Sequence, residues 1–114
     1  MTRIYKLIGR DAWQAALEAG RFDGAAVDLA DGFIHFSTAA QAPETGRRYF
    51  RGHEDLLVIG FEAEALGAAL RWEPSRGGDL FPHLYGPLDP GLAAQTLDVT
   101  LDRDGAPMLE ALQP

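Results

Sequence analysis

The chain has 114 residues, of which 46% are hydrophobic and 24% charged, and this composition predicts one globular domain spanning residues 1–114. Its net charge of −7 argues against general binding to nucleic-acid phosphates or to anionic membranes. The chain contains no cysteine, which excludes disulfides, thiolate chemistry and cysteine metal sites.

The first elements predicted along the chain are a strand over residues 3–8 and a helix. Asp11 is placed to cap the helix, with Gln14 three residues later as in a capping box, and Gly20 is suited to end it. Apolar residues recur at helical spacing from Trp13, so we interpret Trp13 as an anchor in the core.

Residues 31–38, which read DGFIHFST, form the most informative segment. An Asp-Gly turn opens a strand here, and side chains along a strand alternate between two faces. His35 and Ser37 therefore share one face, while Ile34 and Phe36 share the other and are expected in the core. An imidazole and a hydroxyl thus lie together outside the core.

Residues 21–30 give mixed signals and predict a surface loop, whereas a second helix is predicted after Thr38. Its start has two interpretations: Thr38 forms a capping box with Gln41, or Pro43 lies in the first turn of the helix. Gly52 is suited to end it. The helix carries three arginines, which we interpret as a solvated face rather than an anion site: Arg47, Arg48 and Arg51.

The second half of the chain predicts mainly strands. Residues 55–62 contain an unbroken apolar run, typical of a strand covered on both faces. Alternating patterns predict further strands at 69–73 and 95–101, and a turn at 104–105 leads to a short final strand near 108–111. Two helices and about six strands predict an α+β domain around a bent or split, mainly antiparallel sheet.

Residues 81–88 read FPHLYGPL and carry a second polar pair, His83 and Tyr85. Both polar pairs are flanked by large apolar residues, which is typical of a pocket with polar groups in an apolar wall. For His35 and His83 alike, the alternative is a hydrogen-bonded structural role.

Three groups are candidates for one constellation: His35 with Ser37, Glu73 with Arg71, and His83 with Tyr85. Histidine moves easily between acid and base near neutral pH. Glu73 is suited to act as a base or as an acceptor for sugar hydroxyls, and its alternative is an exposed ion pair with Arg71. We expect these groups to converge on one cleft.

Other chemistries find less support in the sequence. The three histidines are far apart and show no H-x-H or H-x-x-x-H spacing, so we expect no metal site, and His53 fits a structural role at a helix end. The chain has no G-x-S-x-G elbow, no P-loop and no G-x-G-x-x-G motif.

Four parts of the sequence resemble a bacterial family catalogued as domain of unknown function 952: residues 32–37, Gln41, residues 70–73 and residues 81–88. The resemblance covers nearly the whole chain, and the octapeptide around His83 is its most specific part. Sequences of this family are distantly similar to ADP-ribosyltransferases. Within that group the H-x-S pattern of His35 and Ser37 is similar to the pattern on the first motif strand of NAD-dependent RNA 2′-phosphotransferases.

This distant likeness implies a split antiparallel sheet with an NAD cleft, and an ADP-ribosyltransferase-like or phosphotransferase-like enzyme. His35 and Ser37 would hold a ribose or the nicotinamide amide, and Glu73 would supply the third-motif residue. The chain departs from the 2′-phosphotransferases in lacking their matching basic residues, and Tyr85 lies later than the second-motif residue. The acidic net charge also disfavours an RNA substrate.

We therefore expect His35, Glu73 and His83 as catalytic residues, with NAD as cofactor and a small molecule or nucleotide as ligand. The expected ligand-binding residues are Ser37, Gln41, Arg71 and Tyr85. Two alternatives stay open: a non-catalytic module that binds a small ligand or nucleotide in the same pocket, and a phosphoesterase using two His-x-hydroxyl pairs, in which Tyr85 replaces the second hydroxyl.

No apolar run approaches the length of a membrane span, and the first eight residues are too short and too mixed for a signal peptide. From the sequence we expect no membrane association and a cytoplasmic location.

Overall fold

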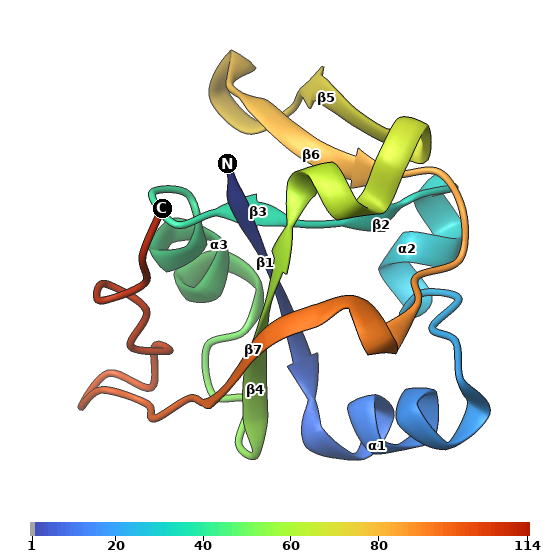
Figure 1. Cartoon of the computed structure of the whole chain (residues 1–114). Helices are drawn as coiled ribbons and strands as arrows, with labels where there is room; N and C mark the ends of the chain where they lie inside the picture. The colour runs from blue at the N-terminus through green and yellow to red at the C-terminus, as the bar shows by residue number, and fades with distance from the viewer. Residues whose placement is uncertain (1) are drawn as a thin grey trace.

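The structure is a computed structural model that describes residues 2–114. Its helices and strands follow the chain in the order shown in Figure 1: β1 Arg3–Gly9, α1 Arg10–Ala19, α2 Ala26–Asp31, β2 Ile34–His35, β3 Ser37–Thr38, α3 Ala42–Tyr49, β4 Leu56–Glu62, β5 Leu70–Pro74, β6 Leu80–Leu84 and β7 Ala93–Asp98. Three 3₁₀ segments connect the later strands: η1 Ala63–Ala69, η2 Arg76–Gly78 and η3 Pro90–Leu92. The α+β class predicted from the sequence is confirmed.

The strands form two antiparallel sheets, one in the order β3-β1-β4-β7 and the other in the order β2-β6-β5. The segment predicted as a single strand is shared between them, because β2 ends at His35 and β3 begins at Ser37. Between the two, Phe36 is 3% exposed and packs edge-on against Phe61 in the core. The chain therefore passes from one sheet to the other at the H-x-S pattern, which explains the split sheet.

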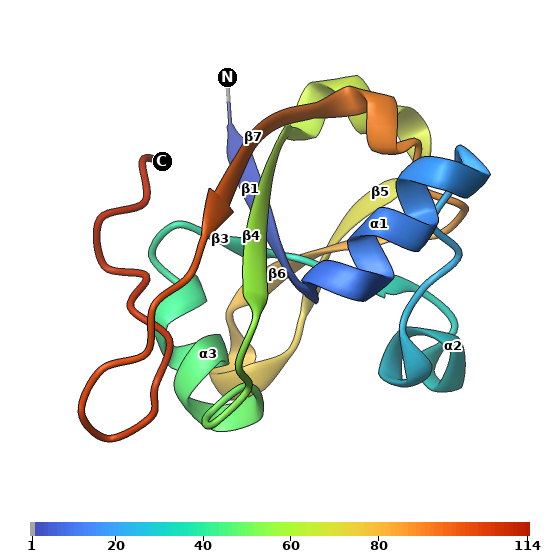
Figure 2. The same ribbon diagram turned by 90° about the horizontal axis from the view of Figure 1, so that it is seen from below.

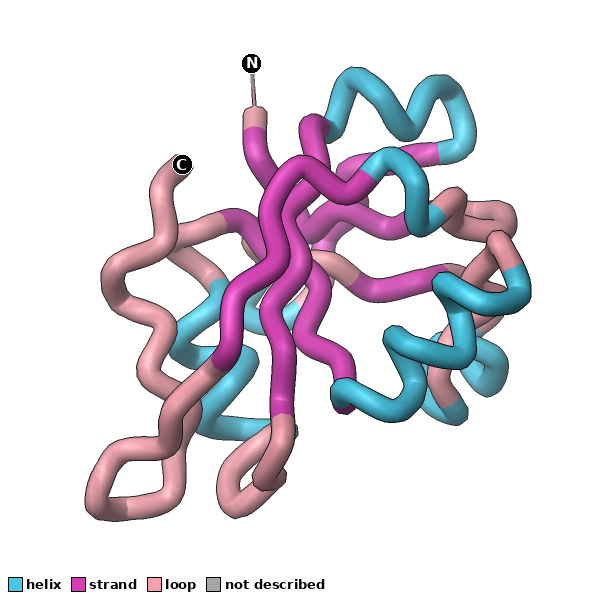
Figure 3. The backbone as a smooth tube through the Cα atoms, turned by 60° about the horizontal axis from the view of Figure 1, so that its bottom comes forward, coloured by secondary structure: helices cyan, strands magenta, loops and turns pink. Residues whose placement is uncertain are grey.

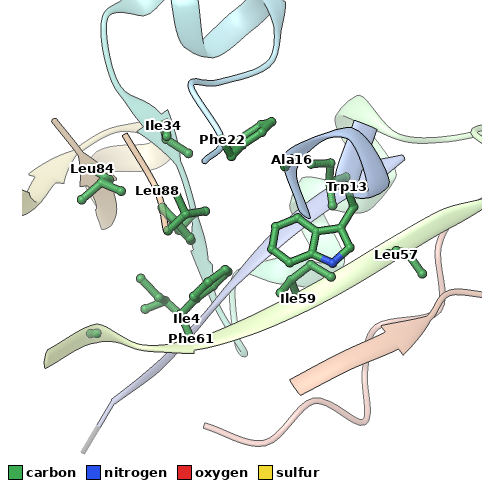
Figure 4. Close-up of a cluster of buried hydrophobic side chains, with 13 residues drawn as sticks. Ile4, Trp13, Ala16, Phe22, Ile34, Leu57, Ile59, Phe61, Leu84 and Leu88 are labelled. Atoms are coloured by element: carbon green, nitrogen blue, oxygen red, sulfur yellow. The ribbon is translucent and has the colours of Figure 1, made fainter. Parts of the chain in front are cut away.

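The main core lies between β4, helix α1 and the second sheet (Figure 4). Trp13 of α1 packs edge-on against Phe61 of β4, with ring centroids 6.3 Å apart, as its helical position predicts. Strand β4 is buried on both faces, as expected from its apolar run, because Ile59 belongs to this core and Val58 to a second cluster around Tyr5. Burying one such aliphatic side chain contributes roughly 1.5–3 kcal/mol.

The strands occupy the middle of the molecule, with helices and loops around them (Figure 3). Helices α1 and α2 lie on one side, and α3 lies on the other beside the C-terminal segment (Figure 2). Residues 2–114 contain no helix long and apolar enough to cross a membrane.

Both predicted helices form, and Gly20 ends α1 as expected, in the left-handed conformation with φ 76°. Helix α1 has Gly9 at its N-cap with no side-chain cap, so the predicted cap at Asp11 is wrong; Asp11 lies in the first turn, where negative charge is favourable. Helix α3 begins at Ala42 with Pro43 in its first turn. Just before it, the Gln41 amide donates to Oγ1 of Thr38 and the Thr38 amide donates to Oε1 of Gln41, so features of both interpretations are present. The helix ends before Phe50 rather than at Gly52.

Two segments differ from the sequence-based expectation. Residues 21–30 include the start of α2, which the sequence did not indicate because no Ser, Thr or Asn caps the helix. Instead, the buried carboxylate of Asp28 accepts a hydrogen bond from the backbone amide of Ala25 at the start of the helix. The final strand near 108–111 does not form, because the C-terminal segment pairs only through an isolated bridge between Leu101 and Pro107. A proline cannot donate the next hydrogen bond of a ladder.

Candidate functional site

A cavity of about 580 Å³ opens between the two sheets. Residues of β1, α2, β2, β3, α3, β6 and the loop before β6 line it. Its size is that of a small-molecule pocket, and its wall mixes aromatic side chains with a few polar groups. The polar and charged side chains in the lining are Lys6, Asp31, His35, Ser37, Thr45, Ser75, Arg76 and His83.

The two histidines singled out by the sequence lie directly opposite each other in the wall of this cavity. His35 of β2 pairs with His83 of β6 in antiparallel register, and their ring centroids are 5.6 Å apart. Directly opposed residues of neighbouring strands point to the same face of a sheet. The structure therefore brings together two histidines that are far apart in the sequence.

A carboxylate orients the His83 ring. Oε1 of Glu73 lies 2.8 Å from Nδ1 of His83 and also accepts a 2.7 Å hydrogen bond from the Tyr85 hydroxyl. The hydrogen bond from Tyr85, followed by the contact with His83, lowers the pKa of Glu73. The hydrogen bond to Glu73 in turn raises the pKa of Tyr85. Because a carboxylate accepts, Nδ1 carries the ring proton and the lone pair of the neutral ring is on Nε2.

Aromatic contacts support this arrangement. Phe33 stacks on His83 with ring centroids 4.0 Å apart, and its ring also lies 5.3 Å from that of Tyr85. The guanidinium of Arg71 lies over the Tyr85 ring at 5.0 Å. Within residues 2–114 Arg71 forms no ion pair with Glu73, so the simple surface pair considered from the sequence is not what engages this carboxylate.

His35 sits between two carboxylates. Its Nδ1 is 2.6 Å from Oδ1 of Asp28, and its Nε2 is 2.9 Å from Oδ2 of Asp31. Each ring nitrogen thus lies within hydrogen-bond distance of a carboxylate oxygen. His83, by contrast, has a carboxylate on Nδ1 alone, and within residues 2–114 its Nε2 has no hydrogen-bond partner.

Asp28 ties this site to the interior through a buried ion pair with Lys6 of β1. Nζ of Lys6 is 3.1 Å from Oδ2 of Asp28, and the backbone amides of Ala25 and His35 also donate to this carboxylate. Burial raises the pKa of Asp28, but the His35 hydrogen bond and the Lys6 charge outweigh it and hold that pKa well below its usual range. Burial lowers the pKa of Lys6, an effect that Asp28 opposes.

Lys6, Asp28 and Asp31 were missed by reasoning from the sequence. A signal for Lys6 existed, because alternation along β1 places it on the same face as Ile4 and Ile8, both of which are core residues. Its partner Asp28 lies 22 residues away and carries no local signature.

The expected ligand-binding residues are placed differently from one another. Ser37 lines the cavity and its hydroxyl is 3.0 Å from that of Thr45. Gln41 is not in the lining; its side chain accepts from the Thr38 amide and donates to the Leu80 carbonyl, so it joins the start of α3 to β6. Arg71 and Tyr85 are not in the cavity lining; Arg71 pairs with His83 across the strands, and the Tyr85 hydroxyl donates to Glu73.

Within residues 2–114 no group of three or more His, Cys, Asp or Glu side chains is placed to hold a metal ion.

Comparison with known proteins places these features in a family. A model of the family described as "Protein of unknown function (DUF952)" matches residues 7–95. The X-ray crystal structure of protein CC0527 from Caulobacter crescentus is 53% identical, with 95% of each chain covered and a TM-score of 0.93. The solution NMR structure of CC0527 is 53% identical over 96% of this chain and 94% of that chain, with a TM-score of 0.86. No curated protein matches the chain.

Proposed function

The chain belongs to the DUF952 family of proteins of unknown function, and we propose that its cavity binds a nucleotide of the NAD or ADP-ribose class and acts on it with a histidine pair. The observation that carries this proposal is the placement of His83. Its Nδ1 is held by Glu73, its ring lines the cavity, and within residues 2–114 Nε2 has no hydrogen-bond partner. A histidine held in this way is a general base with its lone pair directed away from the orienting carboxylate.

The cavity wall supports a nucleotide as the ligand. The aromatic residues Tyr5, Phe36 and Phe81 form part of the lining, together with His35 and Ser37. Flat apolar surfaces with a few converging polar groups suit a base or a nicotinamide joined to a ribose. The H-x-S resemblance to NAD-dependent transferases, noted from the sequence, favours the NAD class among nucleotides.

The proposed reaction on NAD is hydrolysis or transfer at the ribose carbon that carries nicotinamide. The oxygen of a water or acceptor hydroxyl bonds to this carbon, and its proton passes to Nε2 of His83. The bond from carbon to nicotinamide nitrogen breaks, and its electron pair returns to the nicotinamide ring. Glu73 stabilises the imidazolium that forms on His83, and this kind of acid–base assistance is typically worth 10²–10⁴-fold in rate.

The test combines binding with turnover. NAD and ADP-ribose should raise the melting temperature, since a ligand at a hundredfold excess over Kd stabilises the folded protein by about 2.7 kcal/mol. His83→Gln should lower the rate of nicotinamide release by about 10²–10⁴-fold. The matched control is His53→Gln, because His53 is exposed and outside the cavity lining.

Binding of NAD without any nicotinamide release would leave a non-catalytic nucleotide-binding module and contradict the enzymatic part of the proposal. The absence of any effect of millimolar NAD or ADP-ribose on melting would contradict the whole.

One observation favours a second candidate function, a phosphoesterase. The direct cross-strand pairing of His35 and His83 places two imidazole rings beside each other, with centroids 5.6 Å apart. Such a pair fits the cleavage of a cyclic phosphodiester as well as reaction at a ribose carbon. Opening of 2′,3′-cyclic AMP that depends on both histidines, with no reaction of NAD, would decide for this candidate.

A further inference from the structure

Arg76 stands out among the cations of this acidic chain. It begins the η2 segment, lines the cavity and is half-buried. In the part of the chain that the structure describes it forms no ion pair with a carboxylate, although the net charge is −7. Five other arginines do form such pairs: Arg3, Arg10, Arg21, Arg47 and Arg48.

The Arg76 side chain is nevertheless held in place. Its guanidinium lies 4.9 Å from the centroid of the Phe81 ring, and its Nη2 donates to Oγ1 of Thr45 at 3.3 Å. The loop that carries it is closed by backbone hydrogen bonds from Ser75 to Asp79 and from Gly78 to Ser75. A guanidinium has five N–H donors, so most of the fork is left for another acceptor.

Two hydroxyls extend this polar edge of the cavity. The Ser37 and Thr45 hydroxyls are 3.0 Å apart, and Thr45 also donates to the Gln41 carbonyl. Thr45 therefore has its proton engaged, whereas the Ser37 hydroxyl can rotate toward a new acceptor. Arg76, Thr45 and Ser37 together form one hydrogen-bonded row.

The other basic side chains of the cavity have carboxylate partners. Lys6 is paired with Asp28, and His35 lies between Asp28 and Asp31. An anionic group entering the cavity therefore meets its uncompensated positive charge at Arg76. A planar guanidinium beside hydroxyls is the arrangement that recognises phosphate oxygens through parallel N–H bonds.

We propose that Arg76, held in place by Thr45, forms with Ser37 a subsite for one phosphate group, so that the ligand of the cavity is a phosphorylated compound seated with its phosphate at the η2 edge. The inference rests on the proposed function in placing the ligand in the same cavity. It adds the position of the phosphate and requires the ligand to lose affinity when that phosphate is removed.

The experiment compares AMP with adenosine, and inorganic phosphate alone, by isothermal titration calorimetry. AMP should bind about 10- to 100-fold more tightly than adenosine, the usual worth of charge-assisted hydrogen bonds. Arg76→Gln should remove this difference and leave adenosine binding unchanged. Arg76→Lys should restore part of it, because it keeps the charge and loses the planar fork.

The matched control is Arg103→Gln, which removes the same charge at an exposed position outside the cavity lining and should keep the full preference for AMP. Urea unfolding of each variant verifies that the fold is retained. Equal affinities of the wild type for AMP and adenosine, or equal effects of the two glutamine variants, would overturn the phosphate subsite.

The outcomes separate this inference from the proposed function. Release of nicotinamide that depends on His83 but not on Arg76, without a preference for AMP, would reject the subsite and retain the proposed function. A preference for AMP that depends on Arg76, without binding of NAD or ADP-ribose, would retain the subsite and reject the NAD proposal.

Discussion

Asp28 shows how one buried side chain can connect the interior of this protein with its candidate site. Its carboxylate accepts from the Lys6 ammonium, from two backbone amides and from the His35 ring. A buried charge is tolerated only when it is paired and hydrogen-bonded. The contacts that satisfy Asp28 are therefore also the contacts that hold His35 against the cavity wall.

This network predicts a strong asymmetry between single and double substitutions. Asp28→Asn should reduce the free energy of unfolding by about 3–5 kcal/mol, because it leaves the Lys6 ammonium buried without its counter-charge. Adding Lys6→Met should recover about 1–3 kcal/mol of that loss. Urea unfolding measures both values.

A surface pair supplies the control for this comparison. Asp23→Asn breaks the exposed contact with Arg21 and should cost less than about 1 kcal/mol. If the double variant at Lys6 and Asp28 proved less stable than Asp28→Asn alone, the account of a buried charge left unpaired would be wrong.

Helix α3 is positioned by close contact with the C-terminal segment, and Gly46 makes this contact possible. A methyl group at this position would lie 3.0 Å from Cδ1 of Leu109 and 3.3 Å from Cβ of Pro107. The same helix carries Thr45 and Tyr49 of the cavity lining. The seating of α3 therefore bears on the shape of the candidate site.

Gly46→Ala tests this packing because two effects oppose each other. Helix propensity favours alanine by about 1 kcal/mol, whereas overpacking costs typically 1–3 kcal/mol. Pro107 is rigid, so we expect a net loss of up to about 2 kcal/mol in the free energy of unfolding. The loss should shrink in a Leu109→Ala background, where the nearest atom is gone. A gain in stability from Gly46→Ala alone would show that α3 does not pack closely on this segment.

At the scale of elements, the sequence correctly predicted the helices and strands whose burial follows from a local pattern of apolar residues. The apolar run of β4 and the helical spacing around Trp13 correctly predicted buried elements, because alternation and helical period are set by the backbone. Helix α2 was missed because its cap is not a Ser, Thr or Asn side chain. Its N-terminal amide at Ala25 is instead satisfied by Asp28.

In the candidate site too, local patterns predicted some features, whereas others depend on contacts between distant parts of the chain. The face shared by His35 and Ser37 follows from alternation, and both side chains do line one cavity. That His35 meets His83 depends on strand pairing, which the sequence of either strand does not specify. In the sequence Arg76 is followed by two glycines, a pattern that indicates only a loop. Its place in the cavity depends on contacts with Thr45 and Phe81, of which Thr45 is far away in the sequence.

The molecule as a whole carries 17 acidic and 10 Lys or Arg residues, so its response to acid depends on which carboxylates resist protonation. Contacts lower the pKa values of Asp28, Glu73 and Glu44 in the folded state. In the unfolded chain, by contrast, Asp and Glu titrate near their ordinary pKa values of about 3.9 and 4.3. Below about pH 5 the unfolded state therefore binds more protons than the folded state.

Stability should accordingly fall as the pH is lowered. The free energy of unfolding rises with pH wherever the unfolded state binds more protons, so the contribution of Asp28 is fully present above its unfolded pKa and is lost as the pH falls toward its depressed folded pKa. We expect urea unfolding at intervals from pH 7 to pH 3 to show a steady loss of stability below about pH 5. The Lys6→Met/Asp28→Asn variant, which lacks this carboxylate, should show a shallower loss, so the two proteins should approach each other in stability at low pH. A difference between them that stays constant from pH 7 to pH 3 would show that Asp28 is not the carboxylate that links folding to acid.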